Sequence, residues 1–269
     1  MNLYVNGKNR TTECCSLCSL RKELFSEASN IIMIYNGFQT ENDIMLNEGD
    51  SVSFIEKGAM PSEDELEALM MARHTPFVHK KVKRARVAIA GLGGLGSNVA
   101  VALARTGIGH LHLVDFDIVE PSNLNRQAYK IRHLGMKKTE ALKSEIEDIN
   151  PYIKVSIDNV KVTEENAVSL FQNDPIVCEA FDRAEYKAML INTLLEKQPE
   201  IKLVSASGLA GYESSNSITT RKVFNNLYLC GDRKSNAEPG RGLMAPRVSI
   251  CAGHQANMIL RLILGVEEV

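Results

Sequence analysis

Apolar residues in the first part of the chain form short runs that polar turn residues separate. Three of these runs predict strands, at residues 3–5, 31–35 and 51–55. Asn6-Gly7 is a hairpin turn signal directly after the first run. Leucines recur near helical spacing before the second run, at Leu17, Leu20 and Leu24. This order is typical of a β-grasp fold, so we expect a small α+β domain over residues 1–57.

The pattern changes over residues 58–85. Residues 57–61 contain Gly58 and Pro61 and read as a linker. Ser62 followed by Glu65 predicts a capping box, which begins an acidic helix that ends near Arg73. Basic residues follow it, and a solvated face explains them. We therefore expect a linker with N-terminal helices here.

From residue 86 onward, apolar runs alternate with helical segments. The predicted strands are at residues 87–90, 111–114, 155–157, 176–177 and 203–205. The predicted helices are at residues 97–105, 138–149 and 248–264. This alternation predicts an α/β domain over residues 86–269, with a Rossmann-like, doubly wound and mostly parallel sheet.

Composition and charge exclude several functional classes. Of the 269 residues 44% are hydrophobic and 24% are charged, and the formal net charge is −2. No strong basic field exists to attract nucleic acid or an anionic membrane. No apolar stretch approaches the roughly 18 residues of a membrane span, and the N-terminus lacks the pattern of a signal peptide. We expect a cytoplasmic protein without membrane or nucleic-acid partners.

The number and spacing of the cysteines indicate free thiols, not disulfides or a metal site. The chain has six, at Cys14, Cys15, Cys18, Cys178, Cys230 and Cys251. Disulfides are not expected without a secretory signal. Cys15-x-x-Cys18 has no second pair at zinc-site spacing, so we favour free thiols in a surface segment over a metal site.

The strongest local motif is the glycine-rich run at residues 91–96, which follows a predicted strand and begins a helix. Its glycines are Gly91, Gly93, Gly94 and Gly96. Glycines in this context allow a tight turn and close approach of a phosphate, and the helix N-terminus supplies N–H donors. The loop alone indicates a nucleotide. The alternative is a tight strand–helix turn without a ligand.

Polar residues after the second predicted strand narrow the type of nucleotide. Asp115 at the strand end can accept hydrogen bonds from a ribose, which fits NAD and ATP equally. For Asp117 we favour a turn or helix-capping role over contact with the ligand. Asn123, Arg126 and Lys138 lie in a polar insertion that a dinucleotide enzyme does not need. A triphosphate needs cationic and amide donors, so we favour phosphate binding over an ordinary surface role.

Asp182 follows the apolar strand predicted at residues 176–177, at the strand end where ligands bind in open α/β sheets. One carboxylate together with phosphate oxygens is a normal environment for Mg²⁺. The alternative is that Asp182 caps the helix that begins at Ala184, and both can hold.

Together these motifs resemble the ThiF/MoeB adenylyltransferases, relatives of ubiquitin-activating enzymes. The resemblance covers about residues 70–265 and rests on five motifs in order: the glycine run, Asp115-Phe-Asp117, Asn123-Leu-Asn-Arg-Gln127, Gly135-x-x-Lys138 and Asp182. It is greatest to the ThiF branch that carries a fused N-terminal ThiS-like domain, which agrees with the β-grasp reading of residues 1–57.

The resemblance implies a reaction. ATP and Mg²⁺ are the expected cofactors, and the substrate is the C-terminal Gly-Gly carboxylate of a ThiS-like sulfur carrier in thiamine thiazole synthesis. The glycine run and Asp115 would hold the nucleotide, and Asn123, Arg126 and Lys138 the phosphates. Asp182 would hold the magnesium. Arg73 resembles the arginine that such homodimers insert into the partner's site.

The chain departs from the family pattern in three ways. It lacks the paired Cys-x-x-Cys motifs that hold zinc in many members, so no structural zinc is expected. Cys230 lies where some members carry a reactive cysteine, but a buried or incidental role is favoured. Gly58 is followed by Ala59 rather than by a chain end, so the fused domain cannot be adenylated without proteolysis. We expect it to pack on or regulate the enzyme domain.

Three other readings stay open at this point. A related enzyme would activate a small molecule or a modified tRNA base. A second alternative is a non-catalytic scaffold with a fused pseudo-carrier. The presence of Arg126, Lys138 and Asp182 argues against it, because an inactive site need not keep them. An NAD oxidoreductase fits least, because nothing resembles an acid–base pair for hydride transfer.

Overall fold

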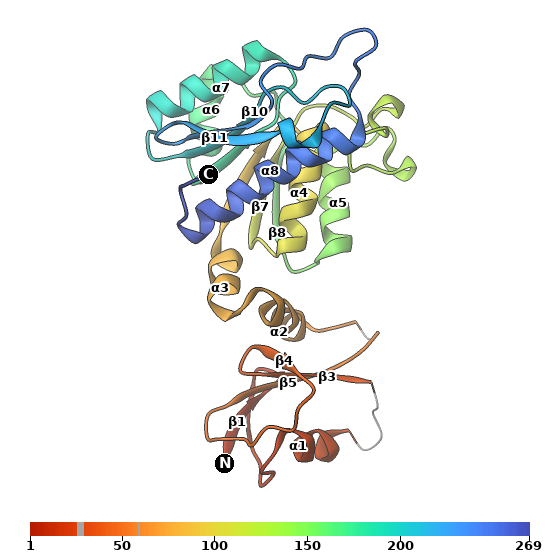
Figure 1. Ribbon diagram of the computed structural model, residues 1–269, viewed down its shortest axis with the longest axis vertical. Coiled ribbons are helices and arrows are strands. Elements are labelled where there is room, and N and C mark those ends of the chain that lie inside the picture. The colour runs from red at the N-terminus through yellow and green to blue at the C-terminus, as the bar shows by residue number, and fades with distance from the viewer. Residues whose placement is uncertain (26–29, 59) are drawn as a thin grey trace. The chain divides into compact units, whose positions relative to one another are not determined.

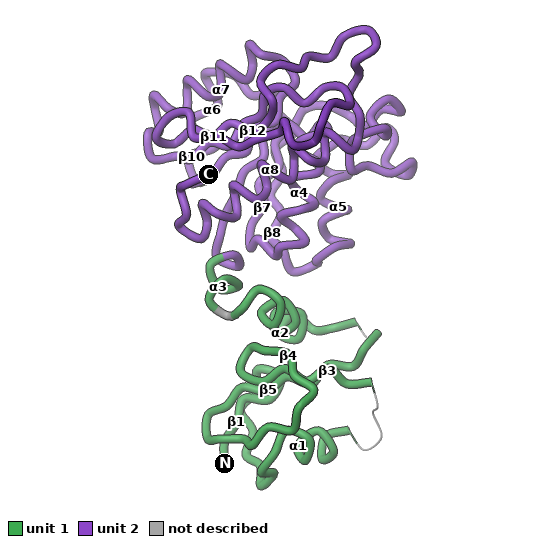
Figure 2. The backbone as a smooth tube through the Cα atoms, in the orientation of Figure 1, with its two compact units in different colours: residues 1–81 green, residues 82–269 purple. Residues whose placement is uncertain are grey.

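The computed structural model describes residues 1–25, 30–58 and 60–269. These residues form two compact units, residues 1–81 and 82–269 (Figure 2). The three-part division expected from the sequence stays a prediction. Within the described ranges, no helix is both long and apolar enough to cross a membrane.

The first unit is an α+β fold with a five-stranded sheet. Its elements are β1 (Asn2–Val5), β2 (Lys8–Thr11), α1 (Leu17–Leu24), β3 (Ile31–Tyr35), β4 (Phe38–Thr40), β5 (Ser51–Glu56), α2 (Glu63–His74) and α3 (Pro76–Arg84), which runs on into the second unit. The strand order is β2-β1-β5-β3-β4, with β1 parallel to β5 and the other pairs antiparallel. The predicted hairpin at Asn6-Gly7 and the capping box of Ser62 with Glu65 are both confirmed.

The second unit carries a seven-stranded sheet that helices cover on both faces (Figure 1). Its main elements are β6 (Arg86–Ala90), α4 (Gly94–Thr106), β7 (His110–Val114), α5 (Lys138–Ile149), β8 (Lys154–Asp158), α6 (Glu164–Phe171), β9 (Ile176–Glu179), α7 (Ala184–Lys197), β10 (Lys202–Ala206), β11 (Thr219–Phe224), β12 (Leu227–Gly231) and α8 (Ala245–Leu264). The strand order is β11-β12-β10-β9-β6-β7-β8, and every pair is parallel except β11 with β12. The predicted doubly wound, mostly parallel sheet is confirmed.

Alternating side chains of β6 explain why both faces are covered. Ala88 and Ala90 belong to a buried cluster with residues of α6 and α7, including Phe171 and Leu190. On the opposite face α4 packs against α8 and α5, and α8 also contacts β10 and β12. Strands that are buried on both faces have continuous apolar sequences, and this is why the apolar runs predicted these strands.

The sequence missed the hairpin of β11 and β12. β11 is an edge strand whose side chains are mostly exposed, and it carries Arg221 and Lys222 in its middle. Such a strand lacks the apolar run that marks the central strands. β12 is parallel to β10, so the sheet extends further than the pattern indicated.

A buried ionic network ties β7 to its neighbours. His112 is 3% exposed. Its Nδ1 lies 2.7 Å from Asp174 Oδ2 and its Nε2 lies 2.8 Å from Asp158 Oδ2. Burial lowers the pKa of His112, but the two carboxylates outweigh that effect and raise it above its usual value.

This network predicts a pH dependence of stability. A raised pKa contributes stability below the unfolded-state value of about 6.5, and that contribution is lost as the pH rises through the folded-state value. The free energy of unfolding should therefore fall above neutral pH. We expect His112→Asn to cost about 1–3 kcal/mol near pH 6 and to flatten this dependence, as measured by urea denaturation followed by circular dichroism.

His254→Asn, at a partly exposed histidine on α8, is the matched control and should keep the wild-type pH slope. An unchanged slope in His112→Asn would show that the network does not carry this dependence.

Candidate nucleotide site

The glycine run forms the connection between β6 and α4. Gly91 has a φ of +90° and lies against the segment after β9: a Cβ at Gly91 would meet the Phe181 ring at 2.9 Å and the Ala180 carbonyl at 3.0 Å. A Cβ at Gly96 would lie 1.9 Å from the Gly91 carbonyl oxygen. No side chain fits there, so the turn requires glycine at residue 96.

This turn leaves the first turn of α4 without a side-chain cap. The N-cap residue is Gly93, which makes no side-chain capping hydrogen bond. The first N–H groups of a helix lack partners within the helix, and together with the helix dipole they favour an anion. The N-terminus of α4 is therefore a suitable phosphate site.

Asp115 holds the glycine loop from the end of β7. It is 8% exposed. Its Oδ2 accepts a hydrogen bond from the Leu92 N–H at 2.6 Å and its Oδ1 one from the Asp117 N–H at 2.8 Å. A carboxylate has about four acceptor positions, so the fixed oxygens can still accept from ribose hydroxyls.

Tyr129 also holds this loop, a role that the sequence analysis missed. Its hydroxyl donates to the Leu92 carbonyl at 2.8 Å. Burial raises the pKa of Tyr129 far above its usual value, so the hydroxyl stays a donor. Leu92 is thus fixed through both of its backbone polar groups. No local pattern marks a tyrosine for this contact, because 37 residues separate the two partners.

Arg126 lies against the start of α4. Its Cγ would be 3.3 Å from a Cβ at Gly94. Asn98 on α4 donates to the Gly94 carbonyl at 2.6 Å and to the Arg126 carbonyl at 2.9 Å. The guanidinium donates to Asn125 Oδ1 at 2.7 Å and to the Ser122 carbonyl at 3.2 Å. Asn98 was also missed, although a polar residue in an apolar helix is a signal that could have found it.

Asn123 and Lys138 lie within the same cluster. Asn123 is 9% exposed, and its Oδ1 accepts from the Glu120 N–H at 2.9 Å. Lys138 begins α5, is 7% exposed and places Nζ 2.8 Å from Asp117 Oδ2. A cation at a helix N-terminus is unfavourable by itself, and the Asp117 carboxylate compensates for it. Asp117 is therefore an ion-pair partner as well as a turn residue.

Asp182 lies two residues beyond Ala180 in the segment that contacts Gly91, and its side chain is exposed. The N-cap of α7 is Arg183, which makes no side-chain capping hydrogen bond, so capping by Asp182 is not observed. The segment is anchored by Glu179, which is fully buried. Glu179 accepts from the Phe181 N–H at 2.7 Å, from Lys187 Nζ at 2.5 Å and from the Ser205 hydroxyl.

Glu179 is a further residue that the sequence analysis did not single out. Its signal was an acidic residue at the end of an apolar strand. Among the described residues, no group of three or more His, Cys, Asp or Glu side chains is arranged to hold a metal ion.

Arg73 and the cysteines are the remaining candidates. Arg73 is exposed near the end of α2, within the first compact unit, so its role at this site stays a prediction. Cys178, Cys230 and Cys251 are fully buried, as expected for core residues. Burial raises the pKa of Cys230 to about 11 and that of Cys251 to about 12, which leaves both as unreactive thiols near neutral pH.

Two family models match the chain: the ThiS-like ubiquitin model over residues 1–58 and the ThiF family model over residues 67–269. The adenylyltransferase and sulfurtransferase UBA4 of Candida glabrata is 31% identical over 197 residues, which cover 69% of this chain and 44% of that protein. The molybdopterin-synthase adenylyltransferase of Haemophilus influenzae is 38% identical over 112 residues, 41% of this chain and 46% of that protein. The matches thus span less than half of each relative's length.

Solved structures share the fold at low identity. The Escherichia coli tRNA N6-threonylcarbamoyladenosine dehydratase TcdA, in complex with ATP, superposes with a TM-score of 0.69 at 22% identity, over 77% of this chain and 98% of that one. E. coli MccB superposes with a TM-score of 0.57 at 23% identity, over 80% of this chain and 67% of that one. Because the ThiF model matches residues 67–269, most of the chain, this protein belongs to the ThiF family and carries an N-terminal ThiS-like ubiquitin domain.

Proposed function

We propose that this protein is an ATP-dependent adenylyltransferase that activates the C-terminal glycine carboxylate of a sulfur-carrier protein. The observation that carries the proposal is the uncapped N-terminus of α4 with Arg126 beside it. Asp115 binds the glycine loop, and Lys138 pairs with Asp117, two residues after Asp115. Asp182 lies two residues beyond Ala180, which approaches Gly91. The names of the curated relatives, adenylyltransferases, support the same reaction class.

In this reaction a carboxylate oxygen of the carrier forms a bond to the α-phosphorus. The bond from that phosphorus to the bridging oxygen breaks, and pyrophosphate leaves. No proton has to move, so the protein needs no nucleophile or base. The chain contributes positioning and charge: α4 N–H groups, Arg126 and Lys138 face the phosphates, and Asp115 accepts from the ribose.

Asp182 fits as the protein ligand of a magnesium ion. Mg²⁺ in such enzymes is held by one or two carboxylates together with substrate phosphates. An exposed carboxylate on a segment anchored by Glu179 meets that requirement. When bound, the ion neutralises phosphate charge.

Within this class we propose thiamine thiazole synthesis as the pathway, a homodimer as the assembly, and Arg73 as a residue that completes the partner's site. The ThiS-like domain supports a carrier-linked pathway. The second candidate is activation of a small molecule or a tRNA base, and the third is a scaffold with a fused pseudo-carrier.

Gly96→Ala should weaken ATP binding strongly. Its Cβ would overlap the Gly91 carbonyl, so the loop must open before the helix N-terminus can reach a phosphate. We expect the dissociation constant for ATP, measured by equilibrium dialysis, to rise by about 100-fold or more. Gly253→Ala, in α8 with nothing within 4 Å of the new Cβ, is the control and should bind normally. Wild-type affinity in Gly96→Ala would place the nucleotide elsewhere.

Pyrophosphate–ATP exchange tests the reaction itself. With ATP, Mg²⁺ and a ThiS-like carrier that has a free Gly-Gly end, exchange should occur, and it should stop when the Gly-Gly end is removed. Asp182→Ala should reduce exchange by about 100-fold. Glu185→Ala removes an exposed carboxylate from the first turn of α7 and should leave exchange unchanged.

The outcomes separate the candidate functions. Exchange that needs no carrier would favour a small-molecule substrate or a processed fused domain. ATP binding without exchange for any carrier would favour the scaffold.

Subunit mixing tests Arg73. If each site uses Asp182 from one copy and Arg73 from the other, both single variants are inactive alone. A refolded or co-expressed one-to-one mixture of Arg73→Ala and Asp182→Ala should then regain about a quarter of the wild-type exchange, because half of the dimers hold one intact site. Arg84→Ala, at another exposed arginine beyond Arg73, should be active without mixing. No recovery in the mixture would argue against a shared site.

A further inference from the structure

Arg247 occupies an unfavourable position. It lies in the first turn of α8 and is only 3% exposed. A cation near a helix N-terminus opposes the helix dipole, and a buried charge is costly unless it is paired and hydrogen-bonded. Helix stability therefore does not account for an arginine here, and its contacts must offset both costs.

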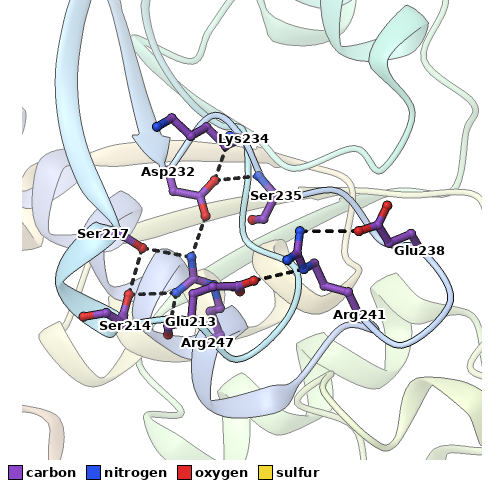
Figure 3. Close-up of polar contacts among 9 residues, drawn as sticks. All are labelled: Glu213, Ser214, Ser217, Asp232, Lys234, Ser235, Glu238, Arg241 and Arg247. Carbon is purple, nitrogen blue, oxygen red and sulfur yellow. Dashed lines mark hydrogen bonds and ion pairs between the residues drawn. The ribbon is translucent and has the colours of Figure 1, made fainter.

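Those contacts join two loops (Figure 3). Nη1 donates to the Glu213 carbonyl and the Ser214 carbonyl, both at 2.9 Å. Nη2 donates to the Ser217 hydroxyl at 3.0 Å and to Asp232 Oδ2 at 2.5 Å. Residues 207–218 connect β10 to β11, and residues 232–244 connect β12 to α8. One guanidinium thus holds both connections to the start of α8.

Asp232 makes this contact rigid. Its Oδ1 accepts from the Lys234 N–H at 2.8 Å and from the Ser235 N–H at 2.9 Å, while Oδ2 binds Arg247. Burial raises the pKa of Asp232, but the backbone N–H groups and Arg247 outweigh it and lower the pKa to about 2. The carboxylate stays charged near neutral pH, so the buried arginine keeps its counter-ion.

A second ion pair joins the loops nearer to the solvent. Arg241 Nε lies 2.9 Å from Glu213 Oε1, and its Nη1 lies 3.4 Å from Glu238 Oε1. The Gly211 N–H donates to the Gly242 carbonyl at 2.8 Å. These contacts link the two connections into one unit, which we call the clasp: residues 207–218, residues 232–244 and Arg247.

The clasp borders the nucleotide site. Val248 follows Arg247 on α8, and its Cγ1 would be 3.1 Å from a Cβ at Gly94. Asn125 donates from Nδ2 to the Leu243 carbonyl at 3.4 Å and accepts from Arg126 through Oδ1. The clasp follows the carboxyl ends of β10 and β12 and contacts Asn125, the neighbour of Arg126, while Asp115 and Asp182 follow β7 and β9.

We propose that Arg247 is a positioning residue for the second substrate, a polypeptide that ends in a carboxylate. By fixing the clasp beside Gly94 and Arg126, it would hold in place the loops next to which that carboxylate reaches the α-phosphate. This inference rests on the proposed adenylation. ATP itself uses groups outside the clasp, so loss of Arg247 should impair use of the carrier far more than binding of ATP.

The test compares Arg247→Met, which removes the charge and all four hydrogen bonds, with Arg221→Met, the same change at an exposed arginine of edge strand β11. We expect Arg247→Met to raise the KM for the carrier in pyrophosphate exchange by about tenfold. The dissociation constant for ATP should stay within about twofold. Trypsin should cleave after Arg233, Lys234 or Arg241 faster than in the wild type, and Arg221→Met should match the wild type throughout.

Two further variants keep the test decisive. Arg247→Lys keeps a charge but cannot span both loops, so it should resemble Arg247→Met. Arg241→Met removes only the outer, partly exposed pair and should shift the carrier KM in the same direction by less. Arg241→Met can replace Arg247→Met in the test if Arg247→Met does not fold.

Three results would overturn the proposal: an unchanged carrier KM, a parallel loss of ATP affinity, or unchanged cleavage of the loops. If the adenylation proposal itself is wrong, the wild-type protein would bind ATP without carrier-dependent exchange, which none of these three results implies. In that case faster cleavage in Arg247→Met would show that the clasp exists, but the role of Arg247 toward a carrier would be refuted together with the reaction.

Discussion

The approach of Gly96 to the Gly91 carbonyl is the constraint on which the site depends. A Cβ would lie 1.9 Å from that oxygen, so the chain can turn from β6 into α4 this tightly only without a side chain. The turn aims the uncapped N-terminus of α4 at the edge of the sheet where β6, β7 and β9 end. Asp115 and Tyr129 then hold the residue in the middle of the turn through its N–H and its carbonyl.

Several buried charged side chains around this turn each form an ion pair with a residue of opposite charge. Lys138 is almost buried at the start of a helix, and Asp117 forms an ion pair with it. Glu179 is fully buried and is matched by Lys187 and by a backbone N–H. Arg247 repeats the arrangement with Asp232 at the next connection. Because each buried charge has a fixed partner, the loops around the site are held by directional contacts as well as by apolar packing.

The ThiS-like domain has a core of its own. Leu3, Leu17, Leu20 and Phe54 are buried in one cluster between α1 and the sheet. α2 contacts β3, β4 and β5 and belongs to the same compact unit, although the ThiS-like model ends at residue 58. The first compact unit therefore contains a helix beyond the end of the ThiS-like match.

The two fold types, the glycine turn and the order of the site motifs could be predicted from local sequence patterns. Buried parallel strands and amphipathic helices have local periods, and the turn depends on residues a few positions apart. The hydrogen-bond and ion-pair partners of these residues emerged only from the folded structure. Tyr129 meets a carbonyl 37 residues away, and Arg247 joins connections from two different strands. β11 was missed because an exposed edge strand has no apolar run. Contacts of this kind follow from strand order and packing, which no local pattern encodes.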